Sequence, residues 1–115
     1  MPITNLTRGT CVAQHVRLAD NPVSRMKGLL GREGLPTQEA LVISPCQSVH
    51  MLFMRFAIDV IFVDRAHKVV GLCPDLKPFQ FSPVFWKSAC AIELAAGTIR
   101  QTQTQIGDEL SIVSP

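Results

Sequence analysis

Short apolar segments separated by proline, glycine and polar turns are the feature that most limits how this chain can fold. Each has the length of a strand, and several alternate apolar and polar residues with a period of two. They predict a small, mainly β domain of the α+β class, either a curved sheet or a partly closed barrel of about seven strands. The expected strands are residues 10–18, 40–44, 49–54, 58–64, 68–72, 89–94 and 110–113.

One or two short helices are expected beside the strands. Asn21 and Pro22 form the cap and first-turn signal of a helix over residues 21–30, which Gly31 ends. The polar segment after Gly97 can form one or two helical turns. Three prolines between residues 73 and 83 predict a long loop, because proline cannot donate a hydrogen bond to a strand ladder.

Length and charge limit the classes of protein to which the chain can belong. We expect a single domain over residues 1–115, because a chain of 115 residues builds one core. A net charge of +2 is too small to favour a nucleic-acid partner. The N-terminus lacks the apolar core of a secretory signal, and the richest apolar stretch, residues 53–63, is too short to span a membrane. We therefore expect a soluble, cytoplasmic protein.

Three segments, taken in order, resemble one known family. They are residues 25–32 (RMKGLLGR), residues 48–64 (SVHMLFMRFAIDVIFVD), and residues 93–108, which begin ELAAGT and end IGD. The chain resembles domain-of-unknown-function family 192, the uncharacterised ACR group of bacterial and archaeal proteins, over residues 8–113. The resemblance implies a compact, β-rich single domain with short helices and no established activity, and some members are exported.

The chain departs from this family at two places. Ala57 stands where the family often has proline. In the third motif, Thr102, Gln103 and Thr104 replace an apolar residue and a glycine. A helix that lacks a glycine C-cap is poorly terminated, so we expect this one to fray.

Asp59 is the most informative single residue of the sequence. The strand that contains it is apolar on both faces, so we expect the carboxylate to be buried. A buried carboxylate needs a cation or several hydrogen-bond donors, and Arg55, Arg100 and His50 are the candidate partners. The favoured interpretation is a structural ion pair, and the alternative is a general base or ligand anchor.

His50 is the candidate partner of Asp59 in acid–base chemistry. A Cys46–His50 dyad is excluded on an extended strand, where the two Cβ atoms would lie about 13 Å apart. Cys46, His50 and Met54 form a weak candidate site for Cu(I). The four cysteines include no C-x-x-C pair, so we expect reduced, structural thiols and no cofactor.

The loop from Lys77 to Lys87 (KPFQFSPVFWK) contains four of the seven aromatic side chains. Two interpretations stay open: the loop caps an open barrel end, or it presents Phe81, Phe85 and Trp86 to another protein.

Together these features favour a small binding or interaction module over an enzyme. The alternative is a small-molecule acid–base enzyme using His50 and Asp59, and the third is a weak single-stranded nucleic-acid binder that uses the loop from Lys77 to Lys87. The candidate binding residues are Arg25, Arg55, Phe81, Phe85, Trp86 and Arg100.

Overall fold

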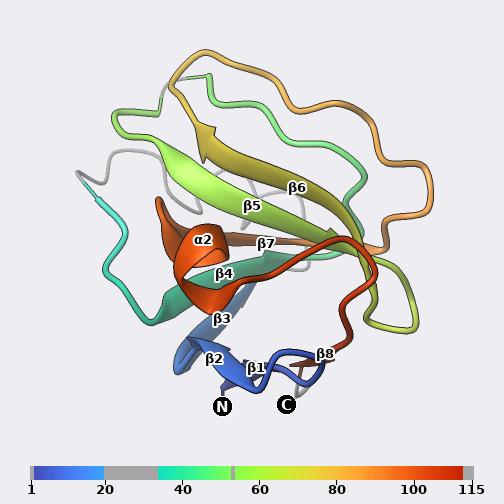
Figure 1. Ribbon diagram of the computed structural model, residues 1–115. Coiled ribbons are helices and arrows are strands. Elements are labelled where there is room, and N and C mark those ends of the chain that lie inside the picture. Colours follow the sequence, from blue (N-terminus) through green and yellow to red (C-terminus); the bar gives the residue numbers. More distant parts are fainter. Residues whose placement is uncertain (1, 20–33, 53, 113–115) are drawn as a thin grey trace.

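The computed structural model describes residues 2–19, 34–52 and 54–112 of the chain (Figure 1). The expected helix at residues 21–30, and Arg25 within it, lie outside the described residues. None of the described helical segments has the length and apolar character that a bilayer-spanning helix needs.

The described residues form eight strands in two sheets, and a five-stranded sheet is the centre of the fold. Its order is β3-β4-β7-β5-β6, with β3 parallel to β4 and the other neighbouring pairs antiparallel. These strands are β3 (His15–Ala19), β4 (Glu39–Ile43), β5 (Ile58–Val63), β6 (Val69–Leu76) and β7 (Cys90–Ala95). Every residue of β5 and β7 is buried, which explains why both segments are almost continuously apolar.

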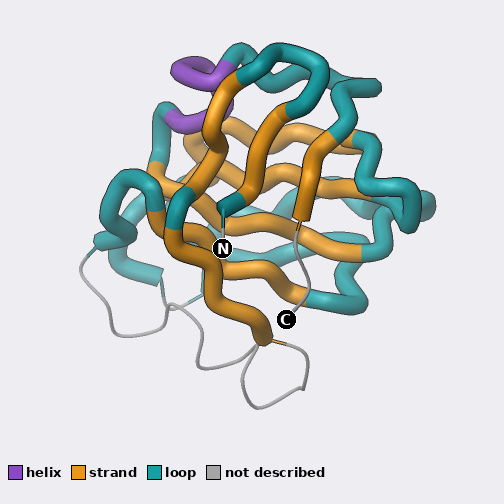
Figure 2. Tube along the Cα trace, turned by 90° about the horizontal axis from the view of Figure 1, so that it is seen from below, coloured by secondary structure: helices purple, strands orange, loops and turns teal. Residues whose placement is uncertain are grey.

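The smaller sheet has the order β2-β1-β8. Its strands are β1 (Ile3–Asn5), β2 (Thr10–Ala13) and β8 (Leu110–Ile112). Along the chain, α2 (Thr98–Thr102) follows β7 and precedes β8. Figure 2 shows the smaller sheet crossing in front of the larger one. The predicted fold class, a small and mainly β α+β domain, is confirmed, with two open sheets in place of a closed barrel.

Two apolar clusters lie on opposite faces of the central sheet, and alternation along β5 assigns residues to each. Ile61 and Val63 contribute to the first cluster, which also contains Ile3, Leu110 and Ile99 from the smaller sheet and α2. Val60 and Phe62 contribute to the second cluster, which the loops after β4 and β6 cover. One face of the sheet is thus closed by regular structure and the other by loops.

Several predicted boundaries need correction. Residues 10–18 form two strands instead of one, and β1 has no counterpart among the predictions. The strand expected at residues 49–54 is not formed within the described part, where these residues make one isolated bridge, from His50 to Phe81. The strand β6 continues through Pro74 to Leu76. Proline is tolerated there because β6 is an edge strand of the sheet, where a missing N–H leaves no neighbour unpaired.

The end of α2 is hydrogen-bonded, contrary to the expectation that it frays. Gln103 adopts the left-handed conformation, with φ of 58°, which a glycine would otherwise supply. Its N–H donates to the carbonyl of Arg100 at 3.2 Å, and the N–H of Thr104 donates to the carbonyl of Ile99 at 3.1 Å.

Asp59 joins β5 to two other elements through backbone hydrogen bonds. It is 1% exposed. Its Oδ1 accepts the N–H of Asp75 at 2.9 Å, and its Oδ2 accepts the N–H of Ile99 at 2.8 Å. Asp75 belongs to the irregular part of the β5–β6 ladder, where the register shifts opposite Asp59. Ile99 belongs to the first turn of α2, so the carboxylate supplies an acceptor to a helix that has no side-chain cap.

The prediction that a cationic side chain pairs with Asp59 is therefore wrong. Arg55 and Arg100 are exposed, and in the described part of the chain the one ion pair joins Arg8 to Asp108. The strand pattern correctly indicated that the Asp59 carboxylate is buried. Two backbone N–H groups, and not a cation, stabilise its negative charge.

We predict that Asp59→Asn lowers the free energy of unfolding by about 1–3 kcal/mol, because the amide nitrogen would face a backbone N–H and leave one buried donor unpaired. The matched control is Asp64→Asn. Asp64 accepts the N–H groups of Ala66 and Lys68 through one oxygen, which asparagine also has. Urea unfolding should show a lower midpoint for the first variant and a change below about 0.5 kcal/mol for the second. Equal midpoints would contradict the role given to Asp59.

Candidate functional site

Two loop segments, residues 46–52 and 77–88, pair along one another and form what we call the aromatic ribbon. Figure 1 shows them running side by side beyond β6, one green and one orange. The pairing uses backbone hydrogen bonds: Met51 N–H to Gln80 O at 2.8 Å, Phe79 N–H to Met51 O at 2.8 Å, Ser82 N–H to Val49 O at 2.9 Å, and Phe85 N–H to Gln47 O at 2.8 Å. The ribbon is therefore an ordered surface with a fixed register.

The inner side of the ribbon packs on the second apolar cluster. Met51 is 1% exposed. The ring centroid of Phe85 lies 4.7 Å from that of Phe62 in β5. A Cβ added at Gly71 in β6 would lie 2.5 Å from the Phe85 ring, so glycine is the residue that allows this close approach. Phe85 thus packs against the core and remains half-buried, unlike Phe81 and Trp86, which are exposed.

The outer side of the ribbon exposes large apolar side chains. Phe79 is 65% exposed, Phe81 66%, Val84 47% and Trp86 77%. His50 is also exposed, with its ring centroid 6.4 Å from that of Phe81. The loop thus covers a face of the sheet, as the first interpretation expects, and also exposes aromatic residues to solvent.

An open groove of about 1100 Å³ lies at the Trp86 end of the ribbon. One wall comes from the ribbon, with Trp86 and Lys87, and another from the turn after β5, with Asp64 and Arg65. Cys46 also lines the groove, and its thiol donates to the carbonyl of Ser48 at 3.0 Å. No sequence pattern pointed to Arg65, because only the fold brings the β5–β6 turn beside Lys87.

The structure does not bring His50 and Asp59 together. Asp59 faces α2 on one side of the central sheet, whereas His50 lies on the ribbon that covers the other side. Nδ1 of His50 accepts the N–H of Leu52 at 3.3 Å, and both oxygens of Asp59 are engaged by backbone N–H groups. An acid–base pair of these two residues is not formed.

The weak metal candidates are also separated by burial. Met54 is 8% exposed and lies in the second apolar cluster, while His50 points to solvent. Within residues 2–19, 34–52 and 54–112, no group of three His, Cys, Asp or Glu side chains is placed to hold a metal ion. The four cysteines are thiols, and burial raises the pKa of Cys90 to about 11, an effect to which Cys46 adds.

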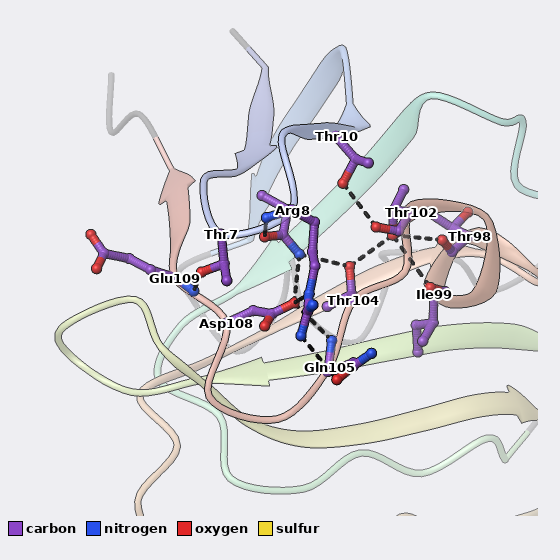
Figure 3. A network of polar contacts seen from close by, with 11 residues as sticks. Thr7, Arg8, Thr10, Thr98, Ile99, Thr102, Thr104, Gln105, Asp108 and Glu109 are labelled. Atoms are coloured by element: carbon purple, nitrogen blue, oxygen red, sulfur yellow. Dashed lines mark hydrogen bonds and ion pairs between the residues drawn. The ribbon is translucent and has the colours of Figure 1, made fainter.

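A buried polar network joins the smaller sheet to the segment after α2 (Figure 3). Asn5, which is fully buried, donates to Thr104 Oγ1 at 3.2 Å and to Asp108 Oδ2 at 3.0 Å. Arg8 Nε donates to the same Asp108 oxygen at 3.1 Å, as does the N–H of Gln105 at 2.9 Å. Burial alone would raise the pKa of Asp108, but these hydrogen bonds outweigh it and hold the pKa below its ordinary value of 3.8. The network satisfies its own groups, which is typical of a structural role.

Glu93 in β7 is a buried carboxyl group for which the described residues provide no partner. It is 9% exposed, and Leu41 and Val60 lie opposite it on the neighbouring strands. Among the described residues no hydrogen bond or ion pair engages its carboxyl group. Burial raises its pKa to about 7 from an ordinary value of 4.5. A single acidic residue within the apolar run CAIELA was the signal that could have singled it out.

We predict that Glu93 makes the protein less stable as the pH rises from about 4.5 to about 7, because the folded state binds its proton more tightly than the unfolded state. The stability contributed by the protonated form is fully present below the unfolded pKa and is lost as the pH passes the folded pKa. The total change is about 3 kcal/mol.

The measurement is urea unfolding of wild type, Glu93→Gln and, as the control, Glu109→Gln, which removes an exposed carboxylate. The stability of Glu93→Gln relative to wild type should rise by about 3 kcal/mol between about pH 4.5 and about pH 8. The Glu109→Gln profile should follow wild type. Parallel profiles for all three proteins would exclude a raised pKa at Glu93.

Comparison with known proteins gives the family and the fold. A family model described as "Uncharacterized ACR", domain of unknown function 192, matches residues 3–112. The chain is 36% identical over 111 residues to a UPF0127 protein of Pyrococcus furiosus, covering 92% of this chain and 93% of that protein. It is 33% identical over 114 residues to a UPF0127 protein of Thermococcus sibiricus, covering 94% and 72%.

A crystal structure of a protein of unknown function from Novosphingobium aromaticivorans has the same fold, with a TM-score of 0.83 at 21% identity. The likeness covers 97% of this chain and 84% of that one. The family resemblance noted in the sequence is confirmed. The chain belongs to the domain-of-unknown-function 192 family, for which no activity is established.

Proposed function

We propose that this protein is an interaction module whose contact surface for another polypeptide is the outer side of the aromatic ribbon. The observation that carries the proposal is the exposure of Phe79, Phe81 and Trp86, each at 65% or more. Aromatic residues are enriched at the energetic centres of protein interfaces, and contiguous apolar surface is rare on monomers.

The way in which the ribbon is held supports this role. Its backbone hydrogen bonds fix the register, and Phe85 anchors its inner side on the core. The outward residues are therefore presented by an ordered segment, so little backbone entropy is lost when a partner binds. A loop that served only as a cover would have no need to leave three aromatic rings in solvent.

The other two functions have less support. Catalysis by His50 and Asp59 requires side chains that the central sheet separates. Single-stranded nucleic acid could stack on the exposed rings, but a net charge of +2 neutralises few phosphates. We propose further that residues 1–115 form one domain and that the protein acts in a reducing compartment such as the cytoplasm. The four free thiols are consistent with such a compartment.

The test compares two double variants with wild type. Phe79→Ser combined with Phe81→Ser removes exposed rings from the ribbon. Leu6→Ser combined with Ile106→Ser removes exposed apolar side chains elsewhere, since Leu6 is 55% and Ile106 61% exposed. Both should keep the wild-type free energy of unfolding within about 1 kcal/mol, because exposed positions contribute little to stability.

Co-purification followed by mass spectrometry should recover a protein partner with wild type and with the Leu6/Ile106 control. The ribbon variant should bind that partner at least about tenfold more weakly. Equal recovery with all three proteins would refute the contact surface.

Tryptophan emission gives an independent prediction, because Trp86 is the single indole of the chain and tyrosine is absent. With 77% of its surface exposed, Trp86 should emit at long wavelength and be quenched by iodide. A blue-shifted and unquenched emission of the free protein would show that the ring is covered.

A further inference from the structure

We propose that the groove at the Trp86 end of the ribbon binds carboxylates of an acidic, extended polypeptide segment. The inference rests on the proposed function and adds to it the chemistry of the partner. It is carried by the charges that line the groove, by its rigid walls and by its continuity with the exposed aromatic side chains.

Two cationic side chains line the groove without an acidic partner in the described part of the chain. Arg65 and Lys87 are both exposed, and neither takes part in the ion pair that the described residues contain. The groove also contains Asp64, but one oxygen of this carboxylate accepts the N–H groups of Ala66 and Lys68 in its own turn. The lining thus has two cations and one carboxylate, a net charge of +1, and neither cation is paired with that carboxylate.

The walls of the groove are held in place before any ligand arrives. Ser88 Oγ donates to the carbonyl of Cys46 at 2.8 Å and lies 3.0 Å from that of Cys90. Gln47 Nε2 donates to the carbonyl of Trp86 at 2.8 Å. The segment that carries Trp86 and Lys87 is therefore tied both to the other ribbon strand and to the start of β7, which lowers the ordering cost of binding.

The groove is continuous with the apolar side of the ribbon, because Trp86 belongs to both. Gln47 pairs with Phe85 at one end and Met51 pairs with Phe79 at the other. The four steps from Gln47 to Met51 span at most about 14 Å of extended chain. An extended peptide of five or six residues can therefore contact Phe79 and Phe81 with apolar side chains and place a carboxylate between Arg65 and Lys87.

This continuity favours a polypeptide over a small anion. A mononucleotide or a free phosphate would occupy the groove and leave Phe79 and Phe81 in solvent. A longer nucleic acid would cover the rings but would meet few cations along the ribbon, whose own charged side chains are Lys77 and Lys87. A segment that alternates apolar and acidic residues fits both parts of the surface.

The test titrates the full chain with defined probes and follows Trp86 emission. The probe is a capped decapeptide of leucine, glutamate and proline, and the matched probe replaces each glutamate by lysine. A ten-nucleotide oligothymidine tests the nucleic-acid alternative. The acidic peptide should shift the emission and bind more weakly as salt increases, because exposed charges are screened. The lysine peptide should bind at least about tenfold more weakly than the acidic one.

Three variants locate the binding energy. Arg65→Gln combined with Lys87→Gln should weaken binding of the acidic peptide by about tenfold, since it removes both ion pairs that the inference requires. Lys77→Gln, at the other end of the ribbon and outside the groove, should change the affinity by less than about twofold. Phe79→Ser combined with Phe81→Ser should weaken binding while Trp86 remains as the reporter.

The outcomes separate the two proposals. Suppose that the ribbon variant loses affinity, that the Arg65/Lys87 variant binds the acidic peptide as tightly as wild type does, and that the lysine peptide binds as tightly as the acidic one. The groove inference then fails, and the proposed interaction surface stands. If neither set of substitutions affects binding of the acidic peptide, both proposals fail. They also fail if no probe binds and the ribbon variant recovers the natural partner as well as wild type does. Tighter binding of oligothymidine than of either peptide would overturn the polypeptide assignment.

Discussion

The carboxylate of Asp59 and the two backbone N–H groups that it binds are the contact on which the arrangement of this fold depends. One hydrogen bond fixes the irregular part of the β5–β6 ladder through Asp75, and the other fixes the first turn of α2 through Ile99. The bond to Ile99 is buried, so water cannot take the place of the carboxylate there, whereas the bond to Asp75 is partly buried. The carboxylate therefore links the edge strand and the helix to the centre of the sheet.

The two faces of the central sheet have different characters. The face toward α2 is closed by the smaller sheet and by a polar network around Asp108 in which donors and acceptors match. The opposite face is covered by a ribbon whose inner side packs and whose outer side remains apolar and exposed. Binding chemistry is therefore expected on the second face, where side chains are exposed that the fold itself does not use.

Much of the fold could be predicted from the sequence, because burial on both faces leaves a nearly continuous apolar run, as in β5 and β7. The ribbon could not, since Val49 and Met51 pair with a loop that contains prolines and not with a strand of the sheet. The carboxylate of Asp59 was recognisable, but its partners are backbone groups, which no residue pattern reveals. Arg65 and Lys87 meet only because a turn and a loop distant in sequence converge.

The close approach of Phe85 to Gly71 makes the position of the aromatic ribbon depend on a residue inside the sheet. A single added methyl group at position 71 would collide with the ring, and Trp86 follows Phe85 directly in the chain. A larger residue at this buried position of β6 would therefore displace the Phe85 ring, directly beside the residue that carries the exposed indole. The position of the outward side chains thus depends on an interior residue of β6 as well as on the ribbon itself.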